Sequence, residues 1–145
     1  MARRSDLQAS LYADAPPARE GNPLFCHQEF LEKMAENRSS TVGRRAALLL
    51  QRLLVDLGRQ HYKPTQGENR GWRRSPLGGN HGNHFYAWWA PKGAAPLKTG
   101  PDFEAAPAGS IFLRDIRHHD DHRPLNPQSL EDHYLPIGAR ELRQE

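Results

Sequence analysis

The chain is 145 residues long, and 20 basic against 17 acidic side chains give a formal net charge of +3 and a pI near 9.3. That length suits one domain that buries its own core, and a single cysteine, Cys26, excludes an intramolecular disulfide and a cysteine zinc cluster. No apolar run follows the basic start, and the longest one, 46–50, is too short to cross a bilayer. We therefore expect a cytoplasmic protein that does not act at a membrane.

The first part of the chain is predicted as an irregular arm followed by two helices. Residues 1–23 contain three prolines and scattered charges, which indicates a mobile arm. Apolar residues at helical spacing predict a short helix over roughly 26–37. A longer amphipathic helix is expected from 41 to about 62, and together the two form a helical hairpin. The apolar stripe of the longer helix consists of Val42, Ala46, Leu49, Leu50, Leu53, Leu54 and Leu57.

Short β-like segments replace the helical pattern after residue 63. We expect strands at 72–77, at 84–90, which is rich in aromatic residues, and at 110–117. Four prolines and three glycines make 91–109 a long loop. Prolines return after residue 123, so 124–145 is expected to be a tail or linker.

This order of elements predicts an α+β domain over residues 24–123. Its N-terminal helical hairpin should pack on a small antiparallel sheet of three to four strands.

The order of several short motifs resembles the RelE/ParE toxin superfamily, in which a helical hairpin precedes a three-strand meander. The turn at Pro76–Gly79, the glycine at Gly82 and the aromatic pair Phe85–Tyr86 are similar to that family's turn and the start of its second strand. The run 111–119 resembles its last strand, which leads into a basic pair. The resemblance covers roughly residues 26–122.

The resemblance implies a protein that acts on RNA or another nucleic acid. Members of the family cleave mRNA, free or on the ribosome, or inhibit gyrase, and an antitoxin is an expected partner. Their ribonucleases use Lys, Arg, His or Tyr and no metal, so no cofactor is expected. Where the family presents an arginine in its second strand, this chain has Ala87, Trp88 and Trp89, so a metal-independent endoribonuclease or a degenerate relative of one fits. The resemblance places the catalytic groups at Arg114, Arg117, His118 and His119.

A weaker likeness gives an alternative function. The N-terminal region of UvrD-type helicase-like proteins carries a similar domain, and no phosphate-binding Gly-x-x-x-x-Gly-Lys-Ser/Thr loop occurs in these residues. The chain would then be a non-catalytic nucleic-acid or protein-binding module of a helicase-like or phage-defence protein, with the ATPase beyond residue 145. The adjacent Trp88 and Trp89 favour this alternative.

A basic cluster with an aromatic residue inside it follows the predicted helices. Basic groups can hold phosphates while an aromatic ring stacks on a base, so this cluster predicts nucleic-acid binding. A solvated loop with a packed tryptophan is an equally weighted interpretation. The cluster consists of Lys63, Arg70, Trp72, Arg73 and Arg74.

The run His118–His122 contains three histidines and two aspartates. These are ligands for zinc, manganese or iron, but neighbours on an extended chain point apart. Three interpretations stay open: a metal site, a catalytic or phosphate-binding role for His118 or His119, and a polar strand end. We adopt the assignment without a metal.

Overall fold

One β-sheet organises the part of the chain that the structure describes. The computed structural model describes residues 23–55, 62–65, 67–80, 83–100 and 102–137. None of the described helices is long and apolar enough to cross a membrane. In chain order the elements are β1 (Leu24–His27), α2 (Gln28–Glu36), α3 (Thr41–Val55), β2 (Lys63–Pro64), η3 (Gly67–Asn69), β3 (Arg73–Asn80), β4 (Asn83–Pro91), η4 (Ala95–Thr99), η5 (Phe103–Ala105), β5 (Ile111–His118), α4 (Leu130–His133) and β6 (Tyr134–Ile137).

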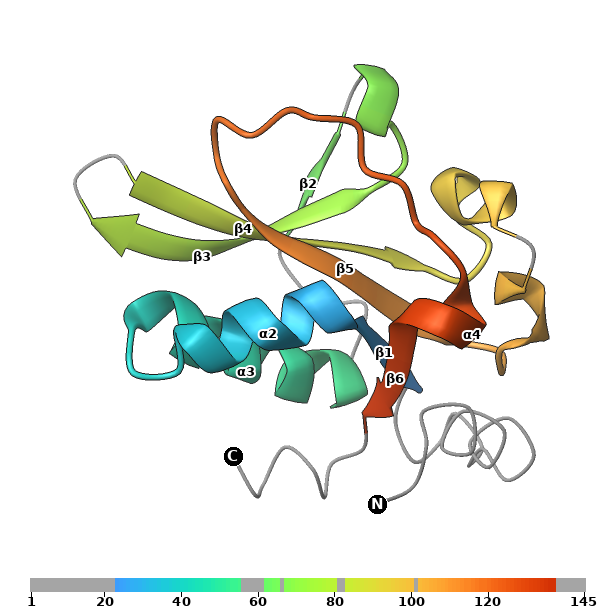
Figure 1. Cartoon of the computed structure of the whole chain (residues 1–145), viewed down its shortest axis with the longest axis horizontal. Helices are drawn as coiled ribbons and strands as arrows, with labels where there is room; N and C mark the ends of the chain where they lie inside the picture. Colours follow the sequence, from blue (N-terminus) through green and yellow to red (C-terminus); the bar gives the residue numbers. More distant parts are fainter. Residues whose placement is uncertain (1–22, 56–61, 66, 81–82, 101, 138–145) are drawn as a thin grey trace.

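The sheet has six strands in the order β2-β3-β4-β5-β1-β6. The strands β3, β4 and β5 form the expected antiparallel meander, while β1 lies parallel to β5 and antiparallel to β6. Figure 1 shows the helices against this sheet, so the predicted α+β class is confirmed. The sheet is larger than predicted, and it is mixed where a purely antiparallel sheet was predicted. Both differences arise because β1 and β6 were not predicted as strands.

The first strand lies where the start of a helix was predicted. All four residues of β1 are buried, which suits a short apolar strand covered on both faces. The helix begins only at Gln28, because His27 keeps an extended backbone and its Nδ1 accepts the Glu29 N–H at 3.0 Å. This bond satisfies one of the free N–H groups of the first helical turn.

The end of the domain also differs from the expectation. Residues 134–137 form β6 at the sheet edge, and Leu125, Leu130 and Tyr134 are buried. Pro136 fits this position because an edge strand tolerates a residue that donates no hydrogen bond. The boundary expected at residue 123 is therefore too early. Residues 1–22 of the predicted arm and 138–145 of the predicted tail lie outside the described part of the chain.

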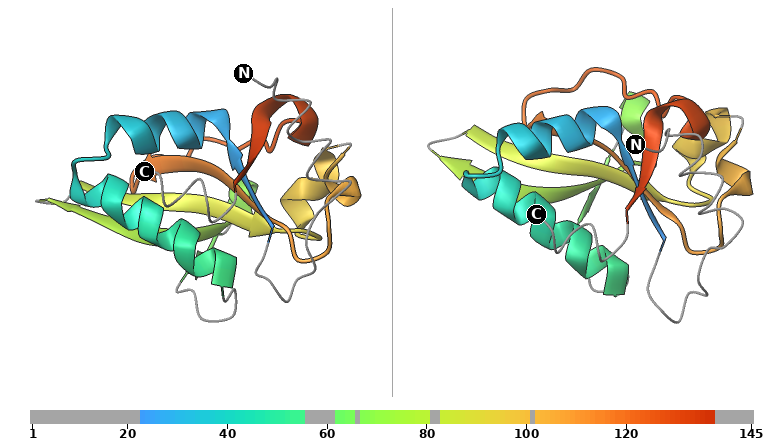
Figure 2. Two further views of the ribbon diagram at one scale, coloured as in Figure 1. Left: turned by 90° about the horizontal axis from the view of Figure 1, so that it is seen from below. Right: turned by 60° about the horizontal axis from the view of Figure 1, so that its bottom comes forward.

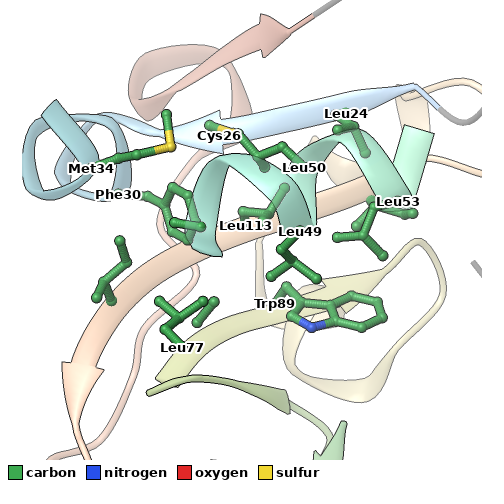
Figure 3. Close-up of a cluster of buried hydrophobic side chains, with 14 of the residues drawn as sticks. Leu24, Cys26, Phe30, Met34, Leu49, Leu50, Leu53, Leu77, Trp89 and Leu113 are labelled. Atoms are coloured by element: carbon green, nitrogen blue, oxygen red, sulfur yellow. The ribbon is translucent and has the colours of Figure 1, made fainter. Parts of the chain in front are cut away.

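Two hydrophobic cores lie on the two faces of the sheet. Helices α2 and α3 lie side by side on one face (Figure 2), and the predicted stripe of α3 is buried from Val42 to Leu53. Figure 3 shows this first core, in which Leu49 and Leu50 of α3 approach Leu113 of β5. Cys26 lies in it too, and burial raises the pKa of its thiol far above the ordinary value. That thiol is therefore a packing group and not a nucleophile.

The second core lies on the sheet face opposite the helices. Alternation along β4 sends Trp89 into the first core and its neighbour Trp88 into the second, where it is 3% exposed. The expected loop over 91–109 contains η4 and η5 and covers part of this face. The second core consists of Phe25, Trp72, Trp88, Ala90, Leu97, Phe103, Ala106, Phe112, Leu125, Leu130 and Tyr134.

Candidate nucleic-acid interface

The sheet separates the members of the predicted basic cluster. Arg73 and Arg74 are neighbours in β3 and therefore point to opposite faces. The Arg73 guanidinium lies 4.4 Å from the ring centre of Tyr62 and 5.2 Å from that of Trp89, on the helix side. Arg70 is exposed in the turn before β3. Trp72 is 1% exposed, and its Nε1 donates to the Leu125 carbonyl at 3.2 Å, so it packs in the core and offers no free ring to a base.

Lys63 and Arg74 are brought together, because they are register partners on β2 and β3. The Arg74 guanidinium lies 5.2 Å from the ring centre of Tyr86 and 5.6 Å from that of Trp88. Lys63 Nζ donates to Tyr86 Oη at 3.5 Å, and the Arg117 guanidinium lies 5.8 Å from the Trp88 ring centre. We call these five residues the basic–aromatic face. Tyr86 was not among the predicted site residues, although its alternation with Trp88 along β4 was visible in the sequence.

Two hydrogen-bond donors on the basic–aromatic face have no partner among the described residues. Arg74 Nε and Trp88 Nε1 are buried, and neither atom forms a hydrogen bond within the described structure. The two residues are register partners on β3 and β4, so these donors belong to neighbouring positions on one face. A buried donor without an acceptor costs about 1–3 kcal/mol. Because both atoms are buried, the acceptor expected here is an enclosed water.

Arg114, one of the predicted catalytic residues, lies inside the protein at 6% exposure. Its Nε donates to the Asn126 carbonyl at 2.6 Å, and its two terminal nitrogens lie 3.3 Å from carbonyl or carboxylate oxygens of Gln128 and Glu29. These bonds join β5 to α2 and to the loop that follows β5. The geometry therefore favours a structural role for this guanidinium.

Arg117 is also buried, and its hydrogen bonds go to the protein. Nε lies 3.0 Å from the Asp115 carboxylate, and Nη1 donates to the Arg123 carbonyl at 2.7 Å. Asp115 in turn accepts from Lys33 of α2 at 2.7 Å. Arg117 thus adds positive charge to the basic–aromatic face, while its donors hold the chain around it. Asp115 is a residue that the sequence analysis missed.

The loop of residues 119–129 follows β5 and is fixed at several points. In Figure 1 it runs as a wide arc from the end of β5 past η3 to α4. The side chain of Asn69, in η3, donates to the Arg123 carbonyl at 3.0 Å and accepts the Leu125 N–H at 2.8 Å. The hydrogen bond to Arg123 holds the pKa of the Asp121 carboxyl well below its usual range. These hydrogen bonds hold the loop beside the basic–aromatic face.

His118 and His119, the other predicted catalytic residues, are half-buried at the end of β5. The His118 ring lies 5.4 Å edge-on from Phe85, and the His119 ring lies 6.0 Å from that of His84. His84 precedes Tyr86 by two positions on β4, so it lies on the same side of that strand as Tyr86. The structure thus brings His84 and His119 to the end of the basic–aromatic face. His84 was not predicted as a site residue, because its partner lies in a distant part of the sequence.

The chain was compared with family models, with curated proteins and with solved structures, and none of them matches it.

Proposed function

We propose that this domain binds single-stranded RNA or another single-stranded nucleic acid on its basic–aromatic face. The observation that carries this proposal is that Lys63 and Arg74, neither of which pairs with a carboxylate among the described residues, both lie against the half-buried ring of Tyr86. Nucleic acids present acceptors on phosphates, sugars and bases, whereas both of these groups can only donate. A cytoplasmic site of action is part of the proposal, since RNA is the substrate class that the resemblance to RelE/ParE toxins implies.

The distribution of charge supports the same face. Lys33, Arg114, Arg117 and Arg123 each lie within 4.0 Å of a carboxylate oxygen. Lys63 and Arg74 are among the described cations for which no such pairing exists, and they are distinguished by lying together against the Tyr86 ring. Cations beside an aromatic ring, without acidic neighbours, suit a phosphate backbone with an adjacent base.

The order of elements gives further support for the family that the sequence resembles. A helical pair followed by the β3–β5 meander is the order that the RelE/ParE resemblance implies. The proposal includes three partners of the protein that the resemblance implies: the ribosome, an antitoxin and a helicase-like neighbour. The non-catalytic module is the alternative that the burial of Arg114 and Arg117 favours.

Binding is tested with a fluorescent single-stranded RNA whose anisotropy is followed at increasing salt. We expect Lys63→Ala and Arg74→Ala each to weaken binding by roughly tenfold and to reduce the salt dependence by about one phosphate contact. Arg52→Ala is the matched control, since it removes the same charge from an exposed position on α3. Equal losses in all three variants would mean that net charge, and not this face, determines binding.

Cleavage of the bound RNA is the second candidate function, and the position of His119 favours it. Its Nδ1 lies 3.0 Å from Asp120 Oδ1, which orients the ring as in acid–base catalysis. Free RNA is incubated with the protein in EDTA, and ribosome-bound RNA is incubated with it in a buffer that contains Mg²⁺. We expect His119→Ala to abolish cleavage and His122→Ala to retain it. An intact substrate with salt-sensitive binding would identify a recognition module.

A further inference from the structure

Three consecutive side chains at the end of β5 converge on one point. One ring nitrogen from each of His118 and His119 and one carboxylate oxygen of Asp120 all lie within 4.8 Å of one another. The two oxygens of Asp120 face different rings: Oδ1 lies 3.0 Å from His119 Nδ1, and Oδ2 lies 3.9 Å from His118 Nδ1. Neighbours on a regular strand point apart, so this convergence depends on the chain leaving the β conformation here.

The backbone around these residues is held by the fold. The His119 N–H donates to the His84 carbonyl at 2.8 Å, which extends the pairing of β4 and β5 by one bond. The Asp121 N–H then donates to the His118 carbonyl at 3.0 Å and closes a turn. The Asp121 carboxylate is engaged by Arg123 at 2.7 Å, so the carboxylate that faces the two rings is that of Asp120. A metal would therefore meet ligands on a fixed turn.

We propose that His118, His119 and Asp120 bind one divalent transition-metal ion of the Zn²⁺ class. Two imidazoles and one carboxylate suit Zn²⁺ and its neighbours, whereas Mg²⁺ and Ca²⁺ prefer oxygen ligands. Ligands bound at ~2.1 Å lie about 3.4 Å apart in a tetrahedral site. The side chains would have to rotate to close that gap, which their partial exposure allows, and water would complete the coordination.

One contact sets a limit on the affinity. The Asp120 N–H donates to His118 Nδ1 at 3.1 Å, so a metal that binds this nitrogen displaces a hydrogen bond. We therefore expect a site of moderate affinity, which fills when the metal is supplied. The competing interpretation is a polar turn whose histidines only hydrogen-bond to Asp120.

The metal site does not depend on nucleic-acid binding, but a bound metal would affect the binding and cleavage of a nucleic acid. The metal would bring two positive charges to the end of the basic–aromatic face. It would also occupy the imidazole of His119, so cleavage that uses this ring for proton transfer would be inhibited by Zn²⁺ and not supported by it.

The test is a titration of the full chain, without a histidine tag, with Zn²⁺ alone, followed by calorimetry and by competition with a chromogenic chelator. We expect one Zn²⁺ per chain at neutral pH, and affinity at least tenfold weaker in each of His118→Ala, His119→Ala and Asp120→Asn. His122→Ala is the matched control, because it removes an exposed imidazole two residues from the cluster.

The chain contains eight histidines, so a wrong assignment would be recognised. The proposal is overturned if the double variant His118→Ala/His119→Ala binds Zn²⁺ as tightly as the parent, if His122→Ala loses as much affinity as the cluster variants, or if the parent binds none. Thermal melting of each variant shows that a loss of affinity is not a loss of fold. Failure of RNA binding would leave every one of these outcomes unchanged, so the two proposals are separable.

Discussion

Replacement of Asp115 by alanine is expected to lower the free energy of unfolding by about 3 kcal/mol, because it removes the nearest carboxylate of the buried Arg117 guanidinium and leaves only Asp121 Oδ2, 3.8 Å from Nε. Asp115 is 2% exposed and accepts three hydrogen bonds, from Lys33 Nζ, from Arg117 Nε and from the Ile116 N–H. Arg117 is itself 8% exposed, so its guanidinium has little access to bulk water. The free energy is measured by urea denaturation, followed by circular dichroism.

Two further variants separate this explanation from a general effect of losing an acid. Asp120→Ala removes an exposed carboxylate nearby and should cost less than about 1 kcal/mol. Lys33→Met should also cost little, because the Lys33 side chain is 37% exposed and its pairing is partly screened. A loss below about 1 kcal/mol in Asp115→Ala would mean that Arg117 finds another partner, and its assignment to structure would then be wrong.

This result bears on the predicted catalytic arginines. If Asp115 and Arg117 stabilise the fold, then a loss of RNA binding in an Arg117 variant reports on folding as much as on contact with the ligand. Lys63 and Arg74 are better probes, since no carboxylate within the described structure pairs with them. Their substitution changes the charge of the basic–aromatic face and leaves the buried ion pairs intact.

The sequence predicted those elements whose signal is local. The leucine stripe predicted α3, and the aromatic and β-branched runs predicted β4 and β5. The strands β1 and β6 have only four residues each, and they pair with partners far away in the chain. Such pairing depends on the packing of the whole domain, so the local hydrophobic periodicity of the sequence does not predict it.

The sequence also predicted only those features of the candidate site that depend on local geometry. Alternation along β3 is a rule of local geometry, so the separation of Arg73 from Arg74 could have been anticipated. The position of Arg114 and Arg117 could not, because a register shift opposite Trp88 and Trp89 changes the alternation of β5. With that bulge, both side chains reach the 119–129 loop. Their burial depends on the loop's path, which sequence patterns do not indicate.

The stability of the domain is expected to fall by about 3 kcal/mol between neutral pH and about pH 4, and His27 is the cause. His27 is 2% exposed, and its pKa is lowered from 6.5 to about 4 by burial and by the nearby charge of Arg114. Both ring nitrogens are used in the neutral form: Nδ1 accepts the Glu29 N–H, and Nε2 lies 2.5 Å from Gln128 Oε1. Protonation of Nδ1 would remove the acceptor that caps α2.

The sign follows from the two pKa values. Since the folded pKa lies below the unfolded value of 6.5, the neutral ring contributes its full stabilisation above about pH 6.5. That stabilisation is lost as the pH falls toward 4, where the unfolded state already binds a proton. Other groups near the ring contribute as well: Glu29 favours the charged form, and His133 stacks on it at 5.5 Å.

Variant His27→Asn isolates the effect of the imidazole. Asparagine can still cap α2 through its side-chain oxygen, but it does not titrate. We expect the variant to be less stable than the parent at pH 7, with a much flatter dependence between about pH 7 and pH 4.5, measured by urea denaturation at each pH. Parallel curves for the two proteins would show that carboxylates, and not His27, govern the acid sensitivity. If the two curves converge at low pH, the acid sensitivity of the parent comes from His27. The parent loses the stabilisation by its neutral imidazole in that pH range, whereas the variant has no imidazole to protonate.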